Sequence, residues 1–225
     1  MSNKCPYEAV LFDLDGTLLD TALDLGKTTN YVLNKYQTGY SISDDVARDY
    51  ASDGMRALMK AAIPENLHQN YDFEKMRLDF LPYYYEHIAD RTIFFPHIAQ
   101  ILQKLTANKI PFAVVTNKPD HLAQQLLKKF PEFDDMGCLV GCDLLPVSKP
   151  DPAPLNYACE KLNVQPSKCV YIGDHKRDIE AGHNAHMDTI LAAWGYIKKG
   201  TNLQGFNAEF IANTPEDLIK LLNLL

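Results

Sequence analysis

Short apolar runs alternate with amphipathic stretches along most of this chain, and this alternation limits its fold more than any other feature. Short apolar runs cover 8–12, 111–116, 137–140, 168–173, 188–193 and 208–212. Stretches with helical spacing of apolar residues cover 97–108, 119–129, 152–162, 176–186 and 215–224. Strands that alternate with helices predict an α/β fold, a Rossmann-like parallel sheet with helices on both faces.

The interval from about residue 20 to residue 90 breaks the alternation. It contains only helical patterns, at 21–36, 43–50, 54–62 and 72–88. A crossover between parallel strands needs only about 10–12 residues, so this longer interval predicts an all-helical module inserted after the first strand. The length of 225 residues agrees with one domain that carries an insertion. We therefore expect an α/β core at 1–19 and 91–225 and a helical domain at 20–90.

The charge balance restricts the partners of the chain. Lys and Arg number 22 against 29 Asp and Glu, a formal net charge of −7 with no run of like charges. This balance gives no surface for nucleic acid or for an anionic membrane. No apolar run approaches the ~18 residues of a membrane span, and the first residues lack an apolar signal region. We expect a cytoplasmic protein with a small partner, and no obligate protein partner is evident.

Asp13 and Asp15 directly follow the first predicted strand. At positions i and i+2 they face the same way if the strand continues. Open α/β sheets bind ligands at this end of their strands, and two acids this close favour a cation between them or a retained proton. The alternative is a helix-capping aspartate beside a solvated neighbour, whereas the Asp-x-Asp-x-Asp-Gly pattern of a calcium loop is absent.

Polar residues also follow other predicted strands. Asp174 and Asp178 stand at i and i+4, on one face if a helix begins there, although an aspartate at a helix start is also an ordinary cap. Thr116 and Asn117 offer a hydroxyl and an amide that suit an anion, or cap the next helix. Lys149 precedes another predicted helix, where a solvated side chain is the alternative. All of these positions lie at one end of the predicted sheet, which favours a shared site.

The order of these motifs resembles that of the haloacid dehalogenase-like superfamily of phosphotransferases. The matching segments are Asp13-x-Asp15-Gly16-Thr17, Thr116-Asn117, Lys149-Pro150 and Gly173-Asp174-x-x-x-Asp178. The helical insertion resembles the cap domain of that family, and the resemblance covers essentially the whole chain. The segments 16–21, 115–119, 148–152 and 194–196 resemble phosphoglycolate phosphatases. The segments 52–58, 77–81 and 173–180 also resemble N-acetylmuramic acid 6-phosphate phosphatases.

The resemblance implies a Mg²⁺-dependent phosphomonoester hydrolase of phosphoglycolate phosphatase type that acts on a small phosphorylated metabolite. Asp13 would be the nucleophile that forms an aspartyl-phosphate, and Asp15 the general acid and then the general base. Asp13, the backbone carbonyl of Asp15, and Asp174 would hold Mg²⁺. Asp178 would lie close by and hold the waters of the metal or Lys149 in place.

Further roles follow from the same resemblance. Thr116, Asn117 and Lys149 would bind the transferring phosphoryl oxygens. Arg56, in the helical insertion, could reach a carboxylate or sugar oxygen of the substrate, and a surface arginine is the alternative. His175, beside the implied metal ligand, could tune a metal or pH response.

Other functions stay open from the sequence. N-acetylmuramic acid 6-phosphate is an alternative substrate. A sugar phosphomutase of the same fold would return the phosphoryl group to a sugar, and a non-catalytic phospho-acceptor or binding protein would use Asp13 as receiver domains do. Asp15 speaks against a dehalogenase, which lacks the second aspartate. His97 and His186 stand where the family usually has glycine, so left-handed backbone is expected at both.

Overall fold

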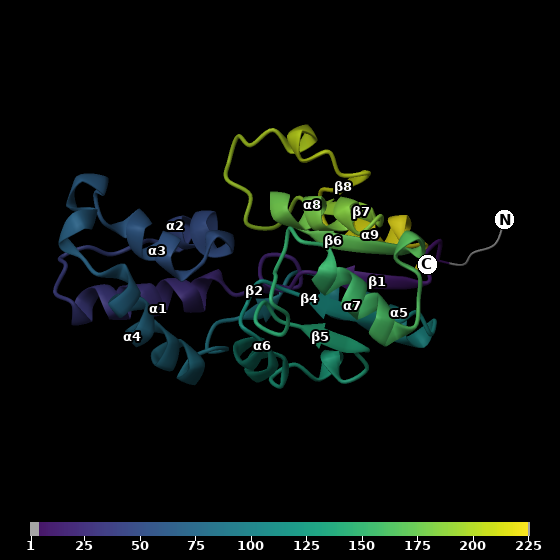
Figure 1. Cartoon of the computed structure of the whole chain (residues 1–225), viewed down its shortest axis with the longest axis horizontal. Helices are drawn as coiled ribbons and strands as arrows, with labels where there is room; N and C mark the ends of the chain where they lie inside the picture. Colours follow the sequence, from purple (N-terminus) through teal and green to yellow (C-terminus); the bar gives the residue numbers. More distant parts are fainter. Residues whose placement is uncertain (1–4, 225) are drawn as a thin grey trace. The chain divides into compact units, whose positions relative to one another are not determined.

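The structure, a computed structural model, describes residues 5–224 and divides into two compact units (Figure 1). One unit combines 5–19 with 94–224, and the other is Asp20–Ile93. The chain passes between them at β2 (Leu19–Asp20) and β3 (Ile93–Phe94), which pair as a separate two-stranded sheet. The sequence did not predict these two short strands, and the helical unit ends at Ile93 rather than at residue 90.

The first unit contains a six-stranded parallel sheet in the order β5-β4-β1-β6-β7-β8. Its strands are β1 (Ala9–Phe12), β4 (Phe112–Val115), β5 (Cys138–Val140), β6 (Cys169–Gly173), β7 (Asp188–Ala192) and β8 (Phe210–Ala212). Every residue of β1, β4 and β6 is buried, as expected for central strands covered on both faces. Each strand lies within one of the apolar runs, and the α/β fold class predicted from the sequence is confirmed.

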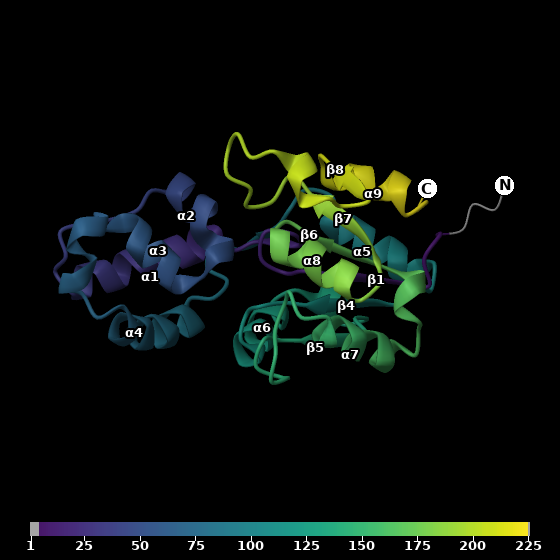
Figure 2. The same ribbon diagram turned by 45° about the horizontal axis from the view of Figure 1, so that its top comes forward.

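Helices cover both faces of this sheet. They are α5 (Ile98–Ala107), α6 (Asp120–Leu127), α7 (Ala153–Leu162), α8 (Lys176–Asn184) and α9 (Pro215–Leu221), with short 3₁₀ turns η3 (Pro131–Phe133), η4 (Pro166–Lys168) and η5 (Leu203–Phe206). Helices α7 and α8 lie on one face, and α5 packs against α9 on the other (Figures 1 and 2). His97 precedes α5 with φ 65° and His186 follows α8 with φ 58°, so both expected left-handed positions are confirmed.

The second unit is helical throughout its interior. It consists of α1 (Ala22–Lys35), α2 (Asp44–Tyr50), η1 (Ala51–Asp53), α3 (Met55–Ala62), η2 (Glu65–Asn70) and α4 (Phe73–Glu86). Ser43 begins α2 by accepting the N–H of Val46, and Asp72 begins α4 by accepting those of Glu74 and Lys75. Within residues 5–224, no helix has both the length and the apolar character needed to cross a lipid bilayer.

Candidate active site

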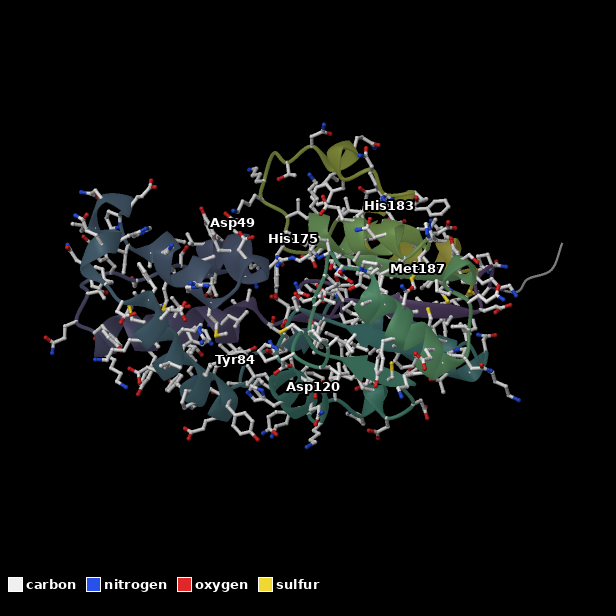
Figure 3. All side chains as sticks on the ribbon, viewed as in Figure 1. Asp49, Tyr84, Asp120, His175, His183 and Met187 are labelled. Carbon is white, nitrogen blue, oxygen red and sulfur yellow. The ribbon has the colours of Figure 1, made fainter. Side chains whose placement is uncertain are left out.

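Polar side chains gather at the carboxyl edge of the sheet in the α/β unit. Strand β1 ends directly before Asp13, β4 before Thr116 and β6 before Asp174. Because the sheet is parallel and β1 lies between β4 and β6, these three residues leave the same edge side by side. His175, labelled in Figure 3, lies at this edge directly before α8. His183, also labelled, lies in the last turn of the same helix.

Lys149 is the cation at the centre of this edge, although its sequence position also allowed a solvated side chain. The side chain is 1% exposed, which excludes that alternative. Its Nζ donates to Asp178 Oδ1 at 2.7 Å and to the Tyr171 hydroxyl at 2.7 Å, and lies 2.9 Å from Asp13 Oδ1. Burial alone would lower the pKa of Lys149, but the carboxylates of Asp13 and Asp178 raise it above its ordinary value. The ammonium therefore stays charged.

Asp13 is the carboxylate with the least support from the protein. Lys149 Nζ lies close to Asp13 Oδ1 but outside hydrogen-bonding geometry, so within residues 5–224 this buried oxygen has no hydrogen-bond partner. Burial raises the pKa of Asp13, and the positive charge of Lys149 only partly opposes this rise. A buried oxygen of this kind is costly unless a ligand or ion completes its contacts.

Asp174 is held in place from both sides. Its Oδ1 accepts the hydroxyl of Thr17 at 3.0 Å, and its Oδ2 accepts the backbone N–H of Tyr196 at 2.9 Å. Gly16 has a φ of 86°, and a Cβ at this position would collide with the Asp174 carboxylate, so the turn after β1 requires glycine. Burial, followed by the charges of Asp13 and Asp178, raises the pKa of Asp174 to about 8.

The three buried carboxylates could hold a metal ion. One oxygen from each of Asp13, Asp174 and Asp178 lies within 4.8 Å of the other two. Asp178 directs Oδ1 to the charged Lys149 and Oδ2 to the backbone N–H of His175 at 2.9 Å. Asp174 accepts from two neutral donors, the Thr17 hydroxyl and the Tyr196 N–H, and Asp13 Oδ1 has no hydrogen-bond partner within residues 5–224. A cation would therefore add most at Asp13 and Asp174. Hard oxygen donors with raised pKa values fit Mg²⁺, which would offset their mutual repulsion.

The side chain of Asp15 has a cation of its own. Lys118 Nζ lies 3.0 Å from Asp15 Oδ1 and 3.2 Å from Oδ2, and the two side chains are 5% and 16% exposed. No sequence motif predicted a role for Lys118. It stands two residues after Thr116 in the same turn, and its backbone N–H donates to the Thr116 hydroxyl. The turn that it shares with Thr116 was therefore the sequence feature that could have identified Lys118 as a site residue.

Thr116 and Asn117 lie at the same edge as the aspartates. Thr116 is buried at the end of β4. Asn117 Nδ2 donates to the carbonyl of Lys149 at 3.1 Å, while its Oδ1 accepts the backbone N–H of Lys149 at 3.2 Å. The side-chain amide of Asn117 therefore fixes the loop that carries Lys149. A contact of Asn117 with a phosphoryl oxygen stays a prediction.

Arg56 and His175 have partners within their own units. Arg56 lies on α3, and its Nη1 is 2.6 Å from Glu74 Oε1 on α4. His175 precedes α8, where its Nδ1 accepts the backbone N–H and the side-chain Nε–H of Arg177. These contacts leave the substrate role of Arg56 and the tuning role of His175 as predictions.

Comparison with known proteins fits this geometry. The model of the haloacid dehalogenase-like hydrolase family matches residues 10–192, which include all of the aspartates described above. The chain belongs to the haloacid dehalogenase-like hydrolase family. A solved structure described as a predicted phosphoglycolate phosphatase from Haemophilus somnus superposes with a TM-score of 0.84, at 26% identity over 98% of this chain and 99% of the other.

Two curated relatives of this haloacid dehalogenase-like hydrolase carry different substrate names. N-acetylmuramic acid 6-phosphate phosphatase of Pseudomonas aeruginosa is 35% identical over 96% of this chain and 95% of its own length. Phosphoglycolate phosphatase of Psychrobacter arcticus is 35% identical over 84% of each chain. The names agree on the reaction, and the chain is a phosphomonoester hydrolase of this family.

Proposed function

We propose that this hydrolase cleaves small phosphate monoesters through an aspartyl-phosphate on Asp13, with 2-phosphoglycolate as the substrate and glycolate and phosphate as products. The observation that carries the proposal is the Asp13 carboxylate, which is buried, unsatisfied at Oδ1 and 2.9 Å from the Lys149 ammonium. A carboxylate with this environment is a nucleophile held ready for an electrophilic ligand.

In the first step an Asp13 oxygen attacks phosphorus, a P–O bond to Asp13 forms and the bond to the substrate alcohol breaks. Asp15 gives its proton to the leaving alkoxide. In the second step Asp15 takes a proton from water, which attacks the same phosphorus and releases Asp13 and phosphate. Thr116, Asn117 and Lys149 bind the phosphoryl oxygens and spread their charge through both steps.

Mg²⁺ is the proposed cofactor, held by Asp13, Asp174 and the backbone carbonyl of Asp15, with Asp178 supporting Lys149. When bound, it supplies positive charge that lets the anionic nucleophile and the anionic phosphoryl group approach. Burial is the largest cause of the raised pKa values of Asp13 and Asp174, and a bound cation would favour the ionised form of both carboxylates. The chain's own cation there, Lys149, supplies a single positive charge against three aspartates.

N-acetylmuramic acid 6-phosphate is the second candidate substrate. Relatives of that name from Pseudomonas aeruginosa and Pseudomonas putida align over 96% of this chain. The helical unit, Asp20–Ile93, is the proposed cap domain that selects between substrates, and Arg56 is its proposed contact with a substrate carboxylate or sugar oxygen.

The test compares kcat/KM for the two esters in the presence of Mg²⁺, for the wild type, Arg56→Ala and Arg77→Ala. Arg77 is the matched control because it also pairs with Glu74, at 3.1 Å. We expect the higher kcat/KM for 2-phosphoglycolate, and a KM increase in Arg56→Ala that Arg77→Ala does not share. A higher value for the amino sugar phosphate would support the second candidate. An isomerised sugar phosphate without released phosphate would indicate a phosphomutase, and absence of turnover would indicate a phospho-acceptor.

A further inference from the structure

Tyr171 is a buried polar side chain for which the proposed reaction has no role. It lies in β6, three residues before Asp174, and its ring packs in the apolar cluster with Leu11, Val115 and Leu155. Its hydroxyl extends beyond that cluster and forms hydrogen bonds with Lys149 and with the backbone of β4.

The Tyr171 hydroxyl has a fixed direction. It donates its proton to the carbonyl of Val115 at 2.7 Å and accepts a proton from Lys149 Nζ at 2.7 Å. Val115 is the last residue of β4, and β4 and β6 lie on either side of the strand that ends before Asp13. The hydroxyl proton is committed to a backbone carbonyl, so a lone pair of the oxygen faces the ammonium. The contact is therefore anchored to the sheet itself.

The hydrogen bonds of Lys149 show what this contact achieves. An ammonium group has three N–H donors. Two are directed to Tyr171 and to Asp178 Oδ1, both at 2.7 Å, and both acceptors are buried. Within the part of the chain that the structure describes, the third has no aligned acceptor, because the nearby Asp13 Oδ1 lies outside hydrogen-bonding geometry.

We infer that Tyr171 is a positioning residue for phosphoryl transfer: with Asp178 it fixes the Lys149 ammonium so that the third N–H is held for an oxygen of the transferring phosphoryl group. This inference rests on the proposed function. Two fixed acceptors determine the direction of the third N–H, since the three donors of an ammonium are tetrahedrally arranged. Orientation set before the substrate arrives lowers the cost of reaching the transition state.

A tyrosine that only packs the core would behave differently. The ring of Tyr171 lies 5.3 Å from Lys149 Nζ, and Tyr171→Phe keeps both this ring and its packing. The substitution removes only the hydroxyl, so a change in catalysis beyond a change in stability reports on the contact with Lys149. Tyr157→Phe on α7 is the matched control, because the lysine ammonium over its ring, 5.0 Å from the centroid, is that of Lys161.

The experiment measures kcat and KM with Mg²⁺ and the ester turned over by the wild type, and the dissociation constant of orthovanadate, a mimic of the transferring phosphoryl group. For Tyr171→Phe we expect kcat to fall and the orthovanadate constant to rise, each about tenfold, with KM changed less than about threefold. Tyr157→Phe should match the wild type. In a Lys149→Met background, Tyr171→Phe should change orthovanadate binding by less than about twofold, because its effect acts through Lys149.

Equal kcat and orthovanadate affinity in Tyr171→Phe and the wild type would overturn the inference. So would an undiminished effect of Tyr171→Phe in the Lys149→Met background. Thermal unfolding of each variant verifies that it folds. If Tyr171→Phe does not fold, Tyr171→Met takes its place, because methionine also lacks the hydroxyl and fills the apolar site. Turnover by the wild type and its loss in Asp13→Asn, measured in parallel, separate failure of this inference from failure of the proposed function.

Discussion

At the scale of single residues, Lys118 is the cation that pairs with Asp15, the proposed acid and base. Lys118 Nζ lies 3.0 and 3.2 Å from the two carboxylate oxygens of Asp15. The proposed second step needs this carboxylate oriented toward the attacking water, and contacts of both oxygens with one ammonium restrict its orientation. We therefore expect Lys118 to assist hydrolysis of the aspartyl-phosphate.

Lys118→Met should slow that second step. We expect kcat to fall roughly tenfold, which corresponds to about 1.4 kcal/mol of activation free energy. The fraction of enzyme trapped as aspartyl-phosphate by acid during steady turnover should rise. Lys129→Met, at an exposed position after α6, should leave both quantities unchanged. A fall in kcat without accumulation of phosphoenzyme would contradict this role for Lys118.

The sequence motifs predicted the aspartates and Lys149 at the carboxyl edge, but not the residues that hold them. Thr17 and Asp174 are 157 positions apart, and Tyr171 reaches Val115 across 56 positions. Contacts over such separations depend on the strand order, which no local pattern specifies. Lys118 shares a turn with Thr116, yet its pairing with Asp15, 103 positions away, depends on the same strand order.

At the scale of secondary-structure elements, Asp24 connects the first helix of the helical unit to the unit's last segment. It is fully buried in α1, and its carboxylate accepts the backbone N–H groups of Arg91 and Thr92 and the Thr92 hydroxyl, at 2.7 to 3.0 Å. These bonds join the first helix of the unit to the segment where the unit ends. Periodicity predicted the helices of the unit well, but the short strands β2 and β3 were missed because two residues carry no periodicity.

Asp24→Ala should destabilise the helical unit strongly. The change leaves the buried N–H and hydroxyl of Thr92 and the partly buried N–H of Arg91 without their acceptor, at a cost of about 3 kcal/mol or more in the free energy of unfolding. Urea denaturation followed by circular dichroism measures this loss. The control, Asp49→Ala, changes an exposed aspartate in the last turn of α2 (Figure 3) and should alter the free energy by less than about 0.5 kcal/mol. Equal stability of the two variants would contradict the role of Asp24.

At the scale of the whole molecule, we expect the buried aspartates to couple stability to pH and, through the proposed Mg²⁺ site, to metal. The net charge of −7 favours no nucleic-acid partner, yet it is compatible with a small anion that meets a bound cation. Without metal, the folded protein keeps a proton on Asp174 up to about pH 8, whereas the ordinary pKa is 3.8. The folded state then binds more protons than the unfolded state between these values. The resulting stability is fully present below about pH 4 and is lost as the pH rises through about 8.

Mg²⁺ should therefore stabilise the protein more at pH 9 than at pH 6, because at pH 6 it must displace the proton of Asp174. The gain in Tm on adding Mg²⁺ should be larger at pH 9 by several degrees, since about 1 kcal/mol shifts Tm by roughly 2–4 °C for a chain of this size. Differential scanning calorimetry of the wild type and of Asp174→Asn, with and without Mg²⁺ at both pH values, measures this difference in the Tm gain. The same gain at both pH values, or an unchanged difference in Asp174→Asn, would contradict the coupling.

We expect Asp13 to carry the phosphoryl group during turnover. The most direct test quenches the turning-over enzyme with acid, reduces the acyl phosphate with borohydride and locates the reduced residue by peptide mass spectrometry. Homoserine is expected at position 13, and only when substrate and Mg²⁺ are present. Turnover with an unreduced Asp13, or homoserine in place of another aspartate such as Asp15, would contradict it.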